Sequence, residues 1–172
     1  MFAVSFSKER DLLSQWRGYA TGAGGPFCIG FPSAMLRERV DAGEGLVWSL
    51  RKCIYSCDEQ AELIEARIFG AVMEVAPLCK HPAFAEEREW RLLFGPVSVK
   101  KVESVHFVER RHTLAPYIEF RLAEGDNVLD HIQWIAGPGP QQERANSAPG
   151  MVAQTAGMTR YHGMPSHTPY LP

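Results

Sequence analysis

The chain has 172 residues, of which 45 % are hydrophobic and 22 % are charged, a composition typical of a globular protein rather than a disordered or fibrous one. This length suffices for one domain with a sizeable core and is too short for two ordinary domains. The formal net charge of −2 excludes an overall basic surface, so a nucleic-acid partner is not indicated.

The pattern of apolar residues argues against a membrane protein. Residues 1–7 lack the basic region and longer apolar core of a signal peptide, and no apolar run approaches the roughly 18 residues that span a bilayer. We therefore expect a cytoplasmic protein with no membrane partner. The four cysteines are then expected to be reduced thiols.

The first third of the chain predicts short strands and short helices. Alternating apolar and small side chains indicate a strand at the start, and the spacing of Trp16 and Tyr19 indicates the helix that follows, with Ser7 as a candidate N-cap. The predicted elements are strands at 2–7, 27–31 and 46–55 and helices at 12–19 and 33–40.

The strongest helix signal begins at Ser56. Ser56 and Glu59 have the spacing of a capping box, and an apolar stripe at helical spacing follows them. Pro77 would end this helix. We therefore expect one long helix over most of residues 57–76.

Strand periodicity dominates from Trp90 onward. The predicted strands are 89–94, 102–108, 117–122 and 132–136. The order of elements indicates an α+β fold, a single domain with a mainly antiparallel or mixed sheet packed against one long helix and shorter helices.

A change in composition at Gly137 marks the last part of the chain. Residues 137–172 are rich in proline and glycine and poor in large aliphatic side chains, so they can bury little apolar surface. We predict an α+β domain over residues 1–136 and a partly ordered segment over 137–172. A short helix is expected at 141–151, with Pro149 and Gly150 stopping it.

The most informative stretch is residues 80–94, KHPAFAEEREWRLLF. If its charged part is extended, Glu87, Glu89 and Arg91 lie on one face, while Trp90 and the apolar residues after it lie on the other. Trp90 would then anchor the strand in the core. Two carboxylates and one guanidinium held together in this way form a candidate site.

Several blocks of this chain occur together in one known family. They are Ser5-Phe6-Ser7, Trp16-Arg17-Gly18-Tyr19, Cys28-Ile29-Gly30-Phe31, Lys80-His81-Pro82, Glu87-Arg88-Glu89-Trp90-Arg91, Leu114-Ala115-Pro116-Tyr117 and Ile135-Ala136-Gly137-Pro138. In their order they resemble the bacterial domain-of-unknown-function family 2971. Members of that family normally begin with a further segment before the Ser-Phe-Ser strand, so the resemblance predicts that this chain lacks the family's N-terminal segment.

The Glu87-Arg88-Glu89 triplet is also similar to the Glu-x-Glu element of ADP-ribosyltransferases. That resemblance implies an enzyme that uses NAD as a substrate, with Glu89 as the central carboxylate, Glu87 as its partner and Arg91 orienting them. A negative charge beside the ribose would stabilise its oxocarbenium-like state. The nucleotide ligand would be bound by Ser5, Ser7, Trp16, Arg17 and Tyr19, with Trp16 or Tyr19 stacking on the nicotinamide.

Each of these interpretations has a structural alternative. A Glu-Arg-Glu-x-Arg run is most often a salt-bridged strand face in solvent, and the chain would then be a non-catalytic module that binds a protein partner. Trp16 is more simply explained as a core residue, and Arg17 as a cation near a helix C-terminus.

A zinc site is a weaker hypothesis. Cys53, Cys57, Cys79 and His81 are the residue types that bind zinc, but their spacing does not match the usual ligand pairs. Buried cysteines that behave as small hydrophobic residues are the expected state, and no metal is predicted.

Overall fold

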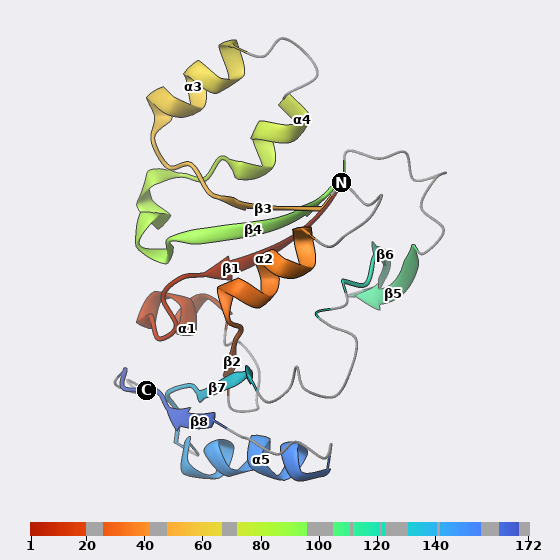
Figure 1. Ribbon diagram of the computed structural model, residues 1–172. Helices are drawn as coiled ribbons and strands as arrows, with labels where there is room; N and C mark the ends of the chain where they lie inside the picture. Colours follow the sequence, from red (N-terminus) through yellow and green to blue (C-terminus); the bar gives the residue numbers. More distant parts are fainter. Residues whose placement is uncertain are drawn as a thin grey trace. The chain divides into compact units, whose positions relative to one another are not determined.

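The computed structural model shown in Figure 1 contains both helices and strands, in the first and the last parts of the chain alike. The structure describes residues 1–19, 26–41, 48–66, 72–95, 105–110, 112–120, 122, 131–140, 142–155 and 162–168. The first three residues of the predicted strand at 102–108 lie outside these residues. Two compact units are present: residues 1–8 with 37–121, and residues 9–36 with 122–172.

A three-stranded antiparallel sheet organises the first unit. Its strands are β1 (Phe2–Ser7), β3 (Trp48–Lys52) and β4 (Glu89–Phe94), in the order β1-β4-β3. β4 is therefore the central strand and pairs along its length with both neighbours. Leu92 and Leu93 point to opposite faces and are both buried, so both faces of the sheet are covered at this end of β4.

Short helices and a hairpin complete the first unit. Ser56 caps the helix that begins at Cys57, since its hydroxyl accepts a hydrogen bond from the Glu59 N–H at 3.3 Å. This confirms the predicted cap. The elements are α3 (Cys57–Glu65), α4 (Val72–Val75), the 3-10 helices η1 (Ala76–Leu78) and η2 (Pro82–Glu87), and the antiparallel hairpin β5 (His106–Arg110) and β6 (Thr113–Tyr117).

The second unit is built on a small mixed sheet. Its strands are β2 (Phe27–Gly30), β7 (Gln133–Ala136) and β8 (His162–Pro165), with β7 in the centre, antiparallel to β2 and parallel to β8. Helix α1 (Leu13–Tyr19) belongs to this unit, and α5 (Gln142–Thr155) packs against β7 and β8 (Figure 1). Helix α2 (Ser33–Asp41) contains the boundary between the units.

The element types confirm the α+β fold, with mostly antiparallel sheets. The long helix predicted from Ser56 to Pro77 corresponds to two described helices, α3 and α4. The division predicted at Gly137 rests on composition rather than on contacts, and it stays a prediction.

Three local predictions were wrong. Ser7 is the last residue of β1 and does not cap α1, which begins at Leu13. The strand predicted at 117–122 lies earlier, at 113–117, because those residues pair with β5. Helix α5 does not stop at Pro149 but continues to Thr155, because the burial of Pro149 and Ala153 outweighs the cost of a proline inside the helix.

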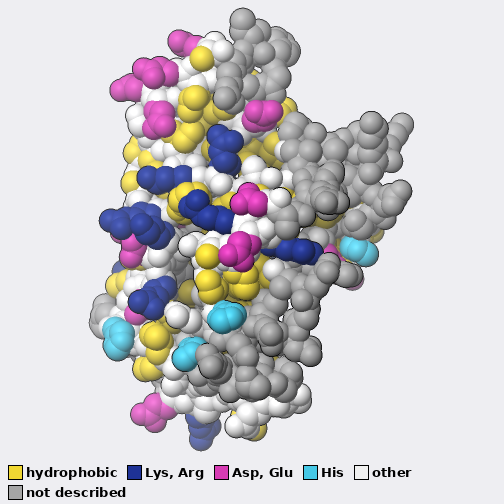
Figure 2. All heavy atoms as spheres, viewed as in Figure 1, with side chains coloured by type: hydrophobic (Ala, Val, Ile, Leu, Met, Phe, Trp, Pro, Cys, Tyr) yellow, Lys and Arg dark blue, Asp and Glu magenta, His cyan; other side chains and the backbone are white. Residues whose placement is uncertain are grey.

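Among the described residues, acidic and basic side chains are both present on the visible face (Figure 2). Acidic side chains gather over α3, at the top of the view, where Asp58 and Glu59 stand in the first turn of the helix. Acidic residues at a helix N-terminus interact favourably with the helix dipole.

None of the helices among the described residues is long and apolar enough to cross a membrane.

Candidate functional site

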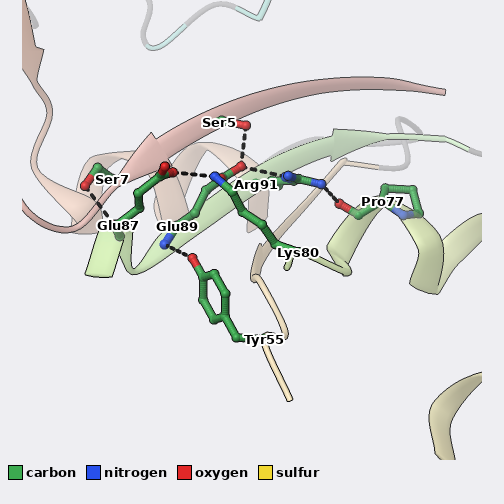
Figure 3. Close-up of polar contacts among 8 residues, drawn as sticks. All are labelled: Ser5, Ser7, Tyr55, Pro77, Lys80, Glu87, Glu89 and Arg91. Atoms are coloured by element: carbon green, nitrogen blue, oxygen red, sulfur yellow. Dashed lines mark hydrogen bonds and ion pairs between the residues drawn. The ribbon is translucent and has the colours of Figure 1, made fainter. Parts of the chain in front are cut away.

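Glu89 and Arg91 lie side by side on one face of β4, as the strand period predicts (Figure 3). The Arg91 Nε donates to the Glu89 Oε1 at 2.7 Å. The same face continues onto β1, where Ser5 is directly opposite Arg91. The Ser5 hydroxyl donates to the Glu89 Oε1 at 2.5 Å, so three residues from two strands meet at one carboxylate.

Glu87 reaches the same place by a different route. The prediction that it lies on the strand was wrong, because Glu87 is the last residue of η2 and the strand begins at Glu89. Arg88 between them adopts a left-handed conformation with φ of 45°, which turns the chain sharply. Ser7 fixes this turn, since its hydroxyl donates to the Glu87 carbonyl at 2.8 Å.

Lys80 joins the two carboxylates. Its ammonium group donates hydrogen bonds to Glu87 Oε2 and to Glu89 Oε2 (Figure 3). We name the four side chains of Lys80, Glu87, Glu89 and Arg91 the charged quartet. Its formal charges are two positive and two negative, so the quartet is neutral when all four groups are ionised.

Sequence reasoning missed Lys80 as a site residue. It precedes the two carboxylates by seven and nine residues, and the intervening segment contains the 3-10 helix η2 and the turn at Arg88, so no single helix or strand period relates these positions. Its position in the same family block was the one available signal.

The backbone of Lys80 is held by the neighbouring segment. The Lys80 N–H donates to the Ile54 carbonyl at 3.0 Å, next to the isolated bridge between Ile54 and Cys79. The side chain of Gln60, on α3, donates to the carbonyls of both Ile54 and Lys80 at 2.6 and 3.0 Å. Thus α3 fixes the place from which the lysine side chain extends.

Two further hydrogen bonds fix the Arg91 side chain and the Glu89 backbone. Arg91 Nη1 donates to the carbonyl of Pro77 in η1, so this 3-10 helix lies over the charged face of β4. The backbone N–H of Glu89 donates to the Tyr55 hydroxyl at 2.8 Å. Neither Pro77 nor Tyr55 was predicted from the sequence, because both come from segments remote from the charged run.

Burial tests whether the charged face lies in solvent. Glu87 is 7 % exposed and Glu89 is 4 % exposed, so the expectation of a solvated strand face is wrong. The reason is the cover that η1, η2 and Lys80 provide. Conversely, Trp90 is only half-buried, and the Arg37 guanidinium lies 5.4 Å from its ring centroid, so Trp90 is not a full core anchor.

Hydrogen bonds determine the charge state of Glu89. Burial raises the pKa of this carboxyl, but hydrogen bonds from Lys80, Ser5 and Arg91 outweigh it and lower the pKa to about 2. Burial likewise lowers the pKa of Lys80, yet its bonds to Glu87 and Glu89 raise it overall. Both groups are therefore charged at neutral pH.

The pKa values of two nearby groups, Cys53 and Tyr55, are shifted as well. Burial raises the pKa of the Cys53 thiol, and the negative charge of Glu89 adds to this. Burial also raises the pKa of the Tyr55 hydroxyl. Both groups are therefore protonated at neutral pH, and neither is an activated nucleophile.

The arrangement can supply a fixed negative charge, but Glu89 cannot act as a general acid or base near neutral pH because its pKa is too low. Its orientation is set by Ser5, Lys80 and Arg91 before any ligand arrives. Preorganised charges of this kind stabilise opposite charge that develops in a transition state.

The remaining predicted ligand residues belong to the second unit. Trp16 is 9 % exposed, and its indole N–H donates to Asp11 Oδ1 at 2.7 Å, so the ring is a core residue. Arg17 and Tyr19 are exposed. Ser5 and Ser7, by contrast, belong to the first unit and contact Glu89 and Glu87 as described above.

The cysteines do not assemble a cluster. All four are free thiols; Cys53 is buried and Cys57 is exposed. Within the described ranges, no group of three or more His, Cys, Asp or Glu side chains is placed so that it could hold a metal ion.

Comparison with known protein families identifies a matching family model. Residues 15–92 match a family model described as "Protein of unknown function (DUF2971)". No curated protein matches the chain, and no solved structure matches it. The matched segment includes Lys80, Glu87, Glu89 and Arg91, which form the charged quartet.

Proposed function

We propose, from the geometry around Glu89, that the chain is an NAD-using ADP-ribosyltransferase or NAD glycohydrolase; its residues 15–92 match the model of the DUF2971 family, which is described as a protein of unknown function. The single observation that carries this proposal is the buried Glu89 carboxylate, which is oriented by hydrogen bonds from Ser5 and Arg91. Glu89 is the central carboxylate, Glu87 is its partner and Arg91 orients Glu89.

The reaction begins with cleavage of a glycosidic bond. The bond between ribose C1′ and the nicotinamide nitrogen breaks, its electron pair leaves with nicotinamide, and the ribose acquires oxocarbenium character. The Glu89 carboxylate stabilises this positive charge. Water or an acceptor nucleophile then forms a bond to C1′ and transfers its proton to Glu87 or to solvent.

The roles of Ser5 and Ser7 and the class of acceptor follow from the same chemistry. Ser5 and Ser7 are positioning residues, because they hold Glu89 and the backbone of Glu87. A protein is the proposed acceptor in the transferase reaction. A cytoplasmic location agrees with four free cysteines and with the cellular supply of NAD.

Release of nicotinamide tests the proposal. The purified full chain is incubated with NAD, and free nicotinamide is measured by chromatography. We expect release by the wild type and a loss of at least about 100-fold in Glu89→Gln, the scale typical for removing one transition-state contact.

Glu86→Gln is the matched control. Glu86 is exposed and differs from Glu89 in burial and contacts rather than in chemistry, so its variant should keep full turnover. Far-UV circular dichroism and thermal unfolding establish that each variant is folded. Absence of nicotinamide release by folded wild type, or equal rates in wild type and Glu89→Gln, would contradict the proposal.

A further inference from the structure

We propose that Lys80 is a built-in inhibitor of this site, occupying the position of a substrate cation until a pyridinium ligand displaces it. This inference rests on the proposed function, because it assigns a regulatory role at the same two carboxylates. NAD carries a positive charge on its nicotinamide ring, and the ring nitrogen adjoins the ribose carbon that reacts. The ligand class is therefore a planar monovalent organic cation.

The net charge of the charged quartet depends on the position of Lys80. With Lys80 in place the quartet is neutral, since Glu87 and Glu89 are balanced by Lys80 and Arg91. A neutral cluster has little attraction for a developing oxocarbenium ion. Withdrawal of Lys80 leaves a net charge of −1, which is the sign that the reaction needs.

The surroundings of the Lys80 ammonium are suited to an organic cation. Its nitrogen contacts both carboxylates and lies 5.2 Å from the centroid of the Phe84 ring. Two carboxylates and an aromatic face are the groups that recognise an organic cation. The lysine thus fills the place that a pyridinium ring would take between Phe84, Glu87 and Glu89.

Exposure makes the exchange feasible. Phe84 is 48 % exposed, so its ring reaches solvent beside the lysine. The Lys80 side chain is 14 % exposed, and four flexible methylene groups allow its ammonium to swing outward. Because one cation replaces another, the carboxylates stay paired throughout.

Binding of 1-methylnicotinamide, a cation that cannot be cleaved as NAD is, tests the inference without turnover. Calorimetric titration compares wild type with Lys80→Met, which keeps the length of the stem, and with Lys80→Arg, which keeps the charge. We expect Lys80→Met to bind the cation at least about tenfold more tightly than wild type. Lys80→Arg should resemble wild type, and neutral nicotinamide should show no such gain.

The aromatic face is tested separately. Phe84→Leu keeps an apolar side chain at a half-exposed position, and it should weaken binding of 1-methylnicotinamide to Lys80→Met by about threefold or more. Equal or weaker cation binding by folded Lys80→Met than by wild type would overturn the inference.

The wild-type chain supplies a test that needs no variant. Acylation of Lys80 by an amine-reactive ester is followed by mass spectrometry, with Lys52, an exposed lysine, as the internal reference. Saturating 1-methylnicotinamide should speed acylation of Lys80 relative to Lys52, and nicotinamide should not. An unchanged ratio overturns the inference even if Lys80→Met does not fold.

The two proposals fail in distinguishable ways. Tight cation binding by Lys80→Met without any nicotinamide release from NAD would remove the proposed reaction and keep the cation site. NAD cleavage by wild type that falls in Lys80→Met, with no gain in cation binding, would keep the reaction and make Lys80 a positioning residue instead.

Discussion

Glu89 shows how much a single side chain can depend on its neighbours. Its carboxylate is almost fully buried, a state that is costly for a charge unless it is paired and hydrogen-bonded. Ser5, Lys80 and Arg91 satisfy it from three segments. Removing one partner from such a group is expected to cost about 3–5 kcal/mol in a fully buried setting, and less here because Lys80 and Arg91 are partly exposed.

The stability of the fold should therefore depend on the ionisation of Glu89. Its pKa is about 2 when folded, below the ordinary value of 4.5, so its contribution is fully present above about pH 4.5 and is lost as the pH falls toward 2. We expect the free energy of unfolding of the wild type to fall more steeply over this range than that of Glu89→Gln.

Urea denaturation at several pH values between about 5 and 2.5 measures this difference. Glu86→Gln should retain the steep wild-type dependence, because Glu86 is exposed. Parallel curves for the wild type and Glu89→Gln would show that Glu89 keeps an ordinary pKa in the folded state.

At the scale of elements, Gly137 marks a close approach in the second unit. It follows β7, and a Cβ atom at this position would lie 2.6 Å from the Pro26 ring and 2.8 Å from the Trp16 ring. The Trp16 ring cannot move easily, because it is buried and hydrogen-bonded to Asp11. The glycine is thus required by packing.

Gly137→Ala is expected to destabilise the chain by about 1–3 kcal/mol through this overlap. Gly139→Ala is the matched control, since a Cβ at Gly139 meets no atom within 4 Å, and its effect should stay within about 0.5 kcal/mol. Chemical denaturation of both variants gives the comparison. Equal stabilities would mean that α1 and β7 do not pack as described.

Local signals predicted several elements well. The strand at residues 2–7, the cap at Ser56 and the strand at Glu89–Phe94 each follow from side-chain period or capping chemistry within a few residues. The 3-10 helix η2 escaped prediction, because its end depends on the left-handed Arg88. Strand β8 escaped as well, since its pairing partner β7 lies far away in the sequence.

At the scale of the whole molecule, the C-terminal residues take part in the second unit. Strand β8 pairs with β7, Ala153 of α5 is buried, and the Ser166 hydroxyl donates to the Asp11 carboxylate. The His167 N–H donates to the other oxygen of Asp11 at 2.8 Å. These contacts join the last part of the chain to the segment before α1.

Deletion of residues 138–172 is therefore expected to lower the thermal unfolding midpoint by several degrees and to broaden the transition. The deletion leaves β7 with one neighbour and Asp11 without its hydroxyl partner. Differential scanning calorimetry of the full and shortened chains makes the comparison. An unchanged midpoint would favour the separable segment that composition predicts.

Sequence by itself determined the fold class, the resemblance to a family and the shared face of Glu89 and Arg91. These follow from periodicity and from ordered motifs, which are local properties of the chain. The family match over residues 15–92 bears out the resemblance. It carries no activity with it, so the reaction is argued from the site alone.

Only the tertiary structure decided that the charged face is buried and that Lys80 joins its two carboxylates. The strand period sets the direction in which a side chain leaves the backbone, but it cannot say what packs over that face. In this chain the cover comes from η1, whose Pro77 carbonyl accepts from Arg91, and from Lys80, which bonds both carboxylates. That cover turns a common surface pattern into a preorganised, self-neutralised site.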